Sequence, residues 1–238
     1  MMSLLSLRKK KLPPAIEPVA SAFPLLRDAE IAAAFAGQRS AGDFYDSFRV
    51  SPSRVLFALL DVAGRRQQNQ DILAKAQRVF REVGSELLSR PDANESDAMT
   101  ELCLQLNRAI MEAARGVHSS PAFAGCYNED LGIVCYFNSG HTPALVRHSN
   151  DVSELGATGL PLGLFSLGTA EARVIAMEPG AALALVSRGV VEAALKSAEL
   201  NAAHHICRSI LDHVQRFTSA APLHDDITAL ALVRTSAS

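Results

Sequence analysis

Asp61 is the residue of this sequence most clearly placed to do chemistry. Six apolar residues, Val55–Leu60, run without a break into its carboxylate, and Gly64 follows shortly after. An apolar run of this length is typical of a buried strand. An ionised carboxylate at the end of such a strand is costly unless a cation, a metal ion or a helix N-terminus compensates it. Asp61 is therefore either part of a charged site or the N-cap of a following helix, and its position alone favours neither.

Further carboxylates stand at the ends of predicted strands. Asp43 follows Gly42, and Asp225 and Asp226 stand directly before the last apolar run. If they converge on one rim with Asp61, they form a site made only of oxygen ligands, which suits Mg²⁺ or Mn²⁺ better than Zn²⁺. Acidic strand ends are common in proteins of this size, so spacing and composition by themselves do not establish a metal site.

The histidines give weaker signals. His204, His205 and His213 lie on or near the last predicted helix, where solvated or helix-packing imidazoles are the simpler interpretation. His141 lies in a turn, where a hydrogen bond to the loop backbone would explain it. The sequence contains no GxxxxGK[ST] phosphate loop, no GxSxG nucleophile elbow and no HExxH metal motif.

The elements that would position these residues are strands interrupted by helices. The turn signal Ser51-Pro52-Ser53 predicts that segments 42–46 and 48–50 form an antiparallel hairpin with the Val55 strand. Apolar residues at helical spacing predict helices over 72–87, 99–113 and 206–217. Further strands are expected over 30–37, 132–137, 144–147, 172–177, 182–186 and 227–233. The pattern favours one domain with two antiparallel sheets and helices outside them.

Composition excludes several classes of function. The net charge of −2 leaves no basic excess to neutralise phosphates, and Trp is absent, so nucleic acid is not an expected partner. No apolar stretch is long enough to span a bilayer. The four cysteines form no CxxC pair and lie in apolar segments, as reduced core residues of a cytoplasmic protein do; they are Cys103, Cys126, Cys135 and Cys207.

The start of the chain is interpreted as a basic tail over residues 1–25. Leucines at positions 4, 5 and 7 precede four basic residues at 8–11. A secretory signal has the opposite order and a longer apolar core. Weak contact with an acidic membrane surface is the alternative for this segment, without stable insertion.

Six motifs occur together in the order of a known family. They are GDFYD at 42–46, LDVAG at 60–64, NSGHTPALV at 138–146, GLPLG at 159–163, VSRGVVEA at 186–193 and DDIT at 225–228. On these motifs the chain resembles the PPM-type (protein phosphatase 2C-like) metal-dependent serine/threonine phosphatases. It is most similar to the bacterial branch typified by stage II sporulation protein E and the stress-response phosphatases. The resemblance implies an α+β fold, a four-layer α/β/β/α sandwich of two antiparallel sheets flanked by helices, in a domain over 26–238.

The resemblance also implies a site with two Mn²⁺ or Mg²⁺ ions, whose bridging water attacks the phosphorus of phosphoserine or phosphothreonine. Two cations lower the pKa of that water and neutralise the phosphoryl oxygens. By motif position, Asp61 would bridge both metals and activate the water, Asp43 and the Val62 carbonyl would serve one metal, and Asp225 the other. Supporting or less certain roles fall on Asp46, Asp226, Arg188, Gly64 and His141.

Arg188 departs from the family pattern, which carries a metal-ligating Asp before Gly189. Two unit charges ~4 Å apart at an effective dielectric of ~20 interact by roughly 4 kcal/mol, so a cation here would disfavour one metal. Arg188 could instead pair with Asp225 in a bidentate fork, leaving one metal or none. It could also swing outward, with Asp226 or Glu192 substituting for the missing carboxylate.

A second departure follows Gly64, where the family has a small or basic residue and then a second glycine. Here Arg65-Arg66 follow, so a bulky side chain replaces that second glycine. Two function classes follow from the resemblance and these departures. The first is a protein serine/threonine phosphatase, a hydrolase with impaired activity, acting on a phosphorylated regulatory protein of the anti-sigma-antagonist type. The second is a catalytically inactive phosphatase-fold binding module, a pseudophosphatase in bacterial signalling. A homodimer stays open in both classes.

Overall fold

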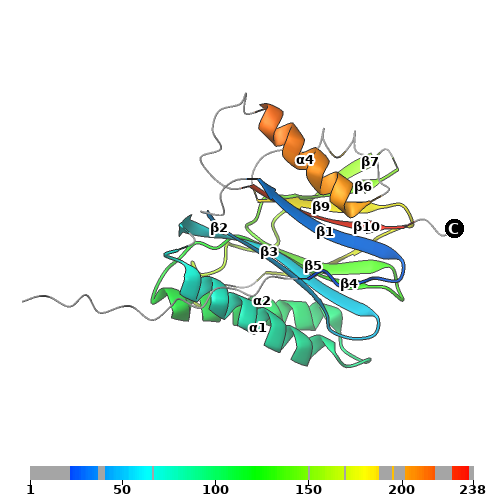
Figure 1. The fold of residues 1–238 in the computed structure, drawn as a ribbon. Coiled ribbons are helices and arrows are strands. Elements are labelled where there is room, and N and C mark those ends of the chain that lie inside the picture. Colours follow the sequence, from blue (N-terminus) through cyan, green and yellow to red (C-terminus); the bar gives the residue numbers. More distant parts are fainter. Residues whose placement is uncertain are drawn as a thin grey trace, which may run out of the picture.

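Two antiparallel five-stranded sheets pack face to face between helices, in the computed structural model of the chain (Figure 1). The structure describes residues 22–36, 41–65, 67–149, 151–168, 170–187, 195, 202–217 and 227–235. One sheet has the strand order β1-β10-β9-β6-β7, and the other has the order β2-β3-β4-β5-β8. Helix α4 covers the first sheet, and α1 and α2 cover the second (Figure 1). This arrangement confirms the predicted α+β sandwich of four layers.

The described helices are α1 (Gln70–Leu88), α2 (Glu95–Ala114) and α4 (Ala203–Phe217). The strands are β1 (Ala29–Ala36), β2 (Ala41–Arg49), β3 (Arg54–Arg65), β4 (Ala122–Asn128), β5 (Ile133–Ser139), β6 (Ala144–His148), β7 (Asp151–Leu155), β8 (Arg173–Ala176), β9 (Ala182–Val186) and β10 (Ile227–Arg234). The predicted hairpin is present, because β2 pairs with β3 through the turn after Arg49. In this turn the backbone N–H of Val50 donates to the Arg54 carbonyl at 3.0 Å. The backbone N–H of Arg54 donates to the Ser51 hydroxyl at 3.1 Å.

The apolar run in β3 is continuous because both faces of the strand are covered. Leu56, Ala58 and Leu60 pack in the cluster beneath α1 and α2. Phe57 and Leu59 alternate with them and pack in the core between the two sheets. A strand with two buried faces needs an unbroken apolar sequence rather than alternation.

Helix ends are fixed by polar side chains at the joint between α1 and α2. The Asn94 side chain accepts hydrogen bonds from the N–H groups of Ser96 and Asp97 at 3.1 and 3.3 Å, which caps the start of α2. The guanidinium of Arg54 donates to the carbonyl of Arg90 at 2.8 Å and pairs with Glu95 at 2.6 Å. The end of α1 and the start of α2 are thereby tied to the first residue of β3.

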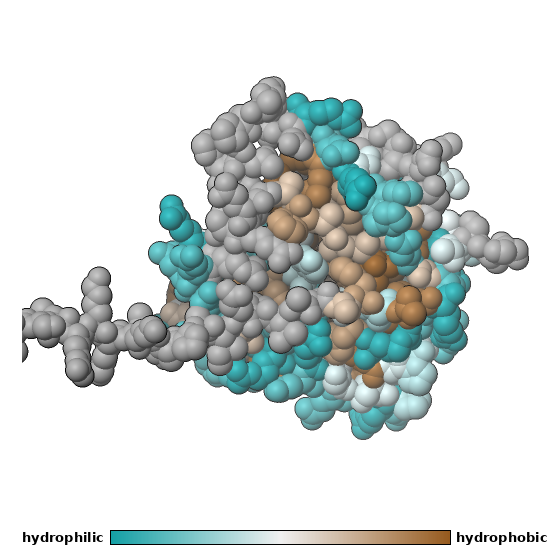
Figure 2. All heavy atoms as spheres, in the orientation of Figure 1, coloured by the Kyte–Doolittle hydropathy of each residue, from teal (hydrophilic) through white to brown (hydrophobic). Residues whose placement is uncertain are grey.

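Residues 22–28 lie against the domain, although positions up to 25 fall within the predicted tail. The Phe23 ring stacks on Tyr45 at a centroid distance of 5.9 Å, and Leu26 packs against the core between the sheets. Residues 1–21 lie outside the described residues. On the side where β1 and β2 form the edges of the two sheets, apolar atoms show at the surface over β1 (Figures 1 and 2).

The cysteines and the helices also bear on the sequence predictions. The four cysteines are buried free thiols, as predicted. None of the helices in the described ranges combines the length and the apolar character that crossing a bilayer demands.

Candidate metal centre

Asp43 and Asp61 lie directly opposite each other in the β2–β3 ladder. Residues paired across an antiparallel ladder point to the same face of the sheet. The pair before them, Tyr45 and Leu59, faces the core between the two sheets, so two-residue periodicity places both carboxylates on that face. The ladder shifts register between Ala41 and Asp43, an irregularity of the kind that redirects side chains near sites. The structure thus brings together two of the predicted metal ligands.

This pair of carboxylates favours a bound cation. Asp43 is 8% exposed and Asp61 is half-buried, so neither is fully hydrated. Like charges placed opposite each other on neighbouring strands repel, and a cation between them would relieve that repulsion. The alternative role of Asp61 as a helix cap does not hold, because β3 continues to Arg65 and the residue that precedes α1 is Asn69.

The end of β3 beyond Asp61 is held by side chains that the motifs did not identify. Asn69 donates its side-chain N–H to the carbonyls of Ala63 at 2.8 Å and Val62 at 3.5 Å, and a ring nitrogen of His118 lies 2.9 Å from the Ala63 carbonyl. Gly64 has a φ of +99°, a conformation that glycine adopts without strain. The Val62 carbonyl, the predicted backbone ligand, is therefore fixed in position. A polar residue directly before a helical apolar pattern could have pointed to Asn69, but no sequence signal marked His118.

His141 lies in the loop between β5 and β6, where its polar atoms contact the loop itself. The side-chain oxygen of Asn138 accepts a hydrogen bond from the His141 backbone N–H at 2.8 Å, and Nδ1 of His141 lies 3.0 Å from the Thr142 carbonyl. Burial lowers the pKa of His141 below its usual value, and the Thr142 carbonyl and the charge of Asp43 oppose that shift. The Nδ1 contact agrees with the predicted backbone hydrogen bond.

Asp46 lies on the other face of the sheet. It pairs with Ala58, which packs beneath the helices, and its side chain is fully buried. Arg81 of α1 donates two hydrogen bonds of 2.7 Å to the Asp46 carboxylate, and Gln77 donates a third at 3.1 Å. The hydrogen bond to Asp46 raises the pKa of the Arg81 guanidinium. Asp46 therefore holds α1 on the sheet and does not face Asp43 and Asp61, so the structure does not place it beside the predicted metal ligands.

Both sheets contribute to the end of the sandwich where Asp43 and Asp61 lie. The Thr142 hydroxyl donates a short hydrogen bond to the carbonyl of Val186, the last residue of β9. The N–H of Ser187 donates to the Thr228 carbonyl at 2.9 Å, and the Thr228 N–H donates to the Ser187 hydroxyl at 3.1 Å. The loop that carries His141 is thereby tied to the adjoining ends of β9 and β10.

The other predicted site residues, Arg188, Glu192, Asp225 and Asp226, lie outside the described residues, as does Arg66. Within the described ranges, no group of three or more His, Cys, Asp and Glu side chains is arranged to hold a metal ion. The described part of the site is thus a partial set of oxygen ligands, consisting of two carboxylates and one backbone carbonyl. Such ligands fit Mg²⁺ or Mn²⁺, which keep several water molecules when bound.

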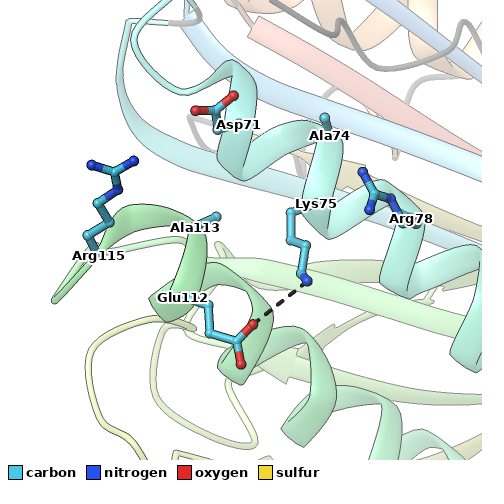
Figure 3. A pocket seen from close by; sticks show the side chains of 7 residues that line it. All are labelled: Asp71, Ala74, Lys75, Arg78, Glu112, Ala113 and Arg115. Carbon is cyan, nitrogen blue, oxygen red and sulfur yellow. Dashed lines mark ion pairs between the residues drawn. The ribbon is translucent and has the colours of Figure 1, made fainter.

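A separate pocket of about 300 Å³ lies between α1 and α2 (Figure 3). Its lining is mostly charged and consists of Asp71, Ala74, Lys75, Arg78, Glu112, Ala113 and Arg115. Lys75 and Glu112 form an ion pair of 3.7 Å across it (Figure 3). The pocket belongs to the helical layer, and the carboxylates of Asp43 and Asp61 do not line it.

The sequence motifs and the paired carboxylates agree with a family comparison. The family model of stage II sporulation protein E (SpoIIE) matches residues 51–235, which is more than half of the chain. The chain belongs to the SpoIIE family. Its members are PP2C-type phosphatases, and that class of enzyme depends on Mg²⁺ or Mn²⁺. A comparison of this SpoIIE-family chain with the curated proteins finds no match.

Solved structures show the same fold. The RsbU and RsbW domains of Rv1364c from Mycobacterium tuberculosis align with a TM-score of 0.73 at 20% identity, covering 92% of this chain and 64% of that one. The PP2C phosphatase domain of SpoIIE from Bacillus subtilis, with a fragment of its regulatory domain, aligns with a TM-score of 0.70 at 16% identity, covering 88% and 64%. RsbX in complex with magnesium aligns with a TM-score of 0.64 at 11% identity, covering 89% and 98%. This SpoIIE-family chain therefore spans less than two thirds of the first two chains.

Proposed function

We propose that this SpoIIE-family domain is a phosphoprotein phosphatase that uses Mn²⁺ or Mg²⁺ to hydrolyse phosphoserine or phosphothreonine, with reduced turnover. The observation that supports this most is the pairing of Asp43 with Asp61 across β2 and β3, on the face between the two sheets. Two carboxylates and the adjoining Val62 carbonyl supply hard oxygen ligands at one point of the fold. The SpoIIE family assignment gives these ligands a phosphatase context.

Each residue has a definite part in this proposal. Asp61 and Asp43 hold the metal, and Asn69 and His118 fix the end of β3 so that the Val62 carbonyl keeps its direction. The bound metal supplies a water of lowered pKa and neutralises the phosphoryl oxygens. Asp225 serves a second metal, and Arg188 weakens the affinity for it because a cation stands where the family has a carboxylate.

The substrate in this proposal is a phosphorylated regulatory protein of the anti-sigma-antagonist type, and the site of action is the cytoplasm. The sequence resemblance to the stress-response phosphatases supports this partner. So does the likeness to a chain described by its RsbU and RsbW domains and to SpoIIE, described as a cell fate determinant.

The test is metal-dependent hydrolysis of p-nitrophenyl phosphate by the wild type and by Asp61→Asn. We expect the wild type to respond to Mn²⁺ and Asp61→Asn to lose the response, because the amide removes one of the two facing charges. Asp92→Asn, in the exposed turn between α1 and α2, is the matched control and should keep the wild-type rate. A wild-type rate no higher than that of Asp61→Asn at saturating Mn²⁺ would exclude the phosphatase proposal.

Arg188 favours a second candidate function, a binding module that recognises a phosphorylated partner without turnover. If charge at position 188 limits metal binding, Arg188→Asp should raise Mn²⁺ affinity and hydrolysis together. Titration calorimetry decides the point, since a wild type that already binds two Mn²⁺ as tightly as Arg188→Asp would show that the arginine does not impair the site. That result would remove the support for the binding module. The phosphatase proposal would then hold without reduced turnover.

A further inference from the structure

The two ends of the helical layer carry opposite charge. Because a short turn joins α1 to α2, the start of α1 lies beside the end of α2 (Figure 3). Among the described residues in 65–79 and 107–116, which form this end, five are basic and two are acidic: Arg65, Lys75, Arg78, Arg108 and Arg115 against Asp71 and Glu112. Residues 80–106, toward the other end, include six acidic and two basic residues. A layer divided in this way attracts an acidic partner to its basic end.

The basic end adjoins the end of β3 that carries two of the predicted metal ligands, Asp61 and the Val62 carbonyl. Asn69, directly before α1, donates to the carbonyls of Val62 and Ala63. His118, shortly after the end of α2, contacts the Ala63 carbonyl at 2.9 Å. These contacts fix the start of α1 and the end of α2 to the end of β3. A protein substrate whose phosphoryl group lies at the metal centre would therefore have the basic end of the helical layer close by.

The pocket between α1 and α2 offers cations that no acid of the described chain neutralises. Lys75 pairs with Glu112 at 3.7 Å, while Arg78 and Arg115 lie on either side of that pair (Figure 3). Neither of these two guanidinium groups forms an ion pair or a hydrogen bond with any residue that the structure describes. Asp71 also lines the pocket, so its basic side chains outnumber its acidic ones by three to two. A guanidinium binds a carboxylate through two parallel hydrogen bonds, so the lining suits aspartate or glutamate side chains.

We propose that this pocket binds an acidic segment of the phosphorylated substrate protein. The inference rests on the proposed function, because it names what the phosphatase recognises beyond the phosphoryl group. A helical rise of about 1.5 Å per residue places Lys75 and Arg78 roughly 9 and 14 Å along α1 from Asn69. An extended peptide covers about 3.3 Å per residue. The acidic residues of the substrate therefore lie at least about three positions from the phosphorylated residue.

The experiment compares the binding of two labelled peptides to the full chain loaded with Mn²⁺, by fluorescence anisotropy. Both peptides carry a phosphonate analogue of phosphoserine, which cannot be hydrolysed. The acidic peptide has aspartates from the third to about the sixth position on both sides of the phosphonate, and the neutral peptide has asparagines at the same positions. We expect the acidic peptide to bind about tenfold more tightly, because a few partly exposed ion pairs contribute modestly each. An ionic strength of about 0.5 M should screen most of that preference.

Substitutions in the pocket should change this preference in opposite directions. Arg78→Gln and Arg115→Gln should each reduce it about threefold. Both should leave the rate on p-nitrophenyl phosphate unchanged, because that substrate has no acidic segment. Glu112→Gln should increase the preference, because it frees Lys75 from its ion pair. Arg90→Gln removes an exposed arginine at the other end of the layer and is the matched control, which should keep the wild-type preference.

The outcomes separate this inference from the proposed function. Equal binding of the two peptides by the wild type overturns the role of the pocket, while Mn²⁺-dependent hydrolysis of p-nitrophenyl phosphate would leave the phosphatase standing. A preference that survives in both Arg78→Gln and Arg115→Gln places the acidic segment elsewhere and refutes the inference. An equal loss in Arg90→Gln assigns the preference to overall charge and also refutes it. A wild type without hydrolysis overturns the phosphatase, and the peptide comparison still decides what the pocket binds because it needs no turnover.

Discussion

Asp43 and Asp46 are three positions apart on the same strand, and their surroundings differ completely. An odd separation along a strand places two side chains on opposite faces of the sheet. Asp43 faces Asp61 between the sheets, while Asp46 faces α1 and receives Arg81 and Gln77. One motif therefore combines a candidate metal ligand with an ion pair that anchors a helix.

Replacing Arg81 by alanine should destabilise the domain more than replacing Arg78, an exposed arginine on the same helix. In Arg81→Ala the Asp46 carboxylate stays fully buried and loses both guanidinium hydrogen bonds, while Gln77 still donates to it; the stacking of the guanidinium over Phe48 is lost as well. We expect the free energy of unfolding in urea to fall by about 2–4 kcal/mol. The control is Arg78→Ala, an exposed arginine on the same helix, which should change it by less than about 0.5 kcal/mol. Equal losses in both variants would show that the buried pair adds nothing specific.

At the scale of elements, the loop between β5 and β6 is held in place by close backbone contact with a second loop. Gly140 has a φ of +67°, and a Cβ atom there would lie 2.5 Å from Cγ and Cδ of Pro161. The neighbouring Ser139 forms an isolated bridge with Gly159. The glycine thus lets the GLPLG loop press against the residue before His141.

Gly140→Ala should therefore destabilise the fold. The substitution combines a strained φ with a clash against a proline ring, and we expect a loss of about 1–3 kcal/mol in unfolding free energy. Gly156→Ala is the matched control, since a Cβ at that glycine meets nothing within 4 Å. Urea denaturation measures the loss, and a Gly140→Ala protein with wild-type stability would contradict the packing argument.

Elements with strong local signals were predictable from the sequence. The β2–β3 hairpin followed from the Ser51-Pro52-Ser53 turn, and α1 and α2 followed from apolar periodicity. The strand Asp151–Leu155 was not predicted, because it is short, mostly exposed and carries only two apolar residues. The strand Ala122–Asn128 was not delimited, because its many small residues resemble a loop as much as a strand.

The sequence predicted only those residues of the candidate site that stand in a recognisable motif. Asp43, Asp61 and Val62 stand in recognisable motifs. Their exact opposition depends on the register shift near Ala41, which no local pattern encodes. The contact of His118 with Ala63 joins residues 55 positions apart, and such pairings arise from the tertiary fold.

At the scale of the whole molecule, residues 22–28 connect the two sheets. They lead directly into β1 of one sheet, and they contact the other sheet through β2 and the turn after β4. The backbone N–H of Arg27 donates to Glu129 at 2.6 Å, and Arg49 binds both Glu129 and the Leu25 carbonyl. Glu129 is the common partner of this connection, and its side chain is fully buried.

Glu129 should make the stability of the domain depend on acid. Burial alone would raise its pKa, but hydrogen bonds and charges from Arg49 and Arg27 outweigh burial and lower the pKa below the usual 4.5. An acid whose pKa is lowered by folding stabilises the protein above its usual pKa and ceases to do so as the pH falls toward the folded value. The free energy of unfolding should therefore drop as the pH falls below about 4.5.

Urea denaturation at several pH values tests this expectation. Glu129→Gln should be less stable than the wild type at pH 7 and should show a smaller decline between pH 5 and about pH 3. Glu86→Gln, which alters an exposed residue of α1, should keep the wild-type dependence. The same decline in Glu129→Gln as in the wild type would assign the acid sensitivity to other carboxylates.

The pairing of β1 with β10 bears on how the chain folds as it is synthesised. The strands β2, β3, β4, β5 and β8 of one sheet lie within residues 41–176, whereas β1 pairs with β10 in the register Ala29 to Arg234. Contacts between such distant segments form late. The sheet of β2, β3, β4, β5 and β8 and the helices α1 and α2 can assemble on the ribosome while the face that carries Asp43 and Asp61 is still uncovered. That face is covered only after residues 227–234 emerge, so a metal centre between the two sheets would be completed only at that point.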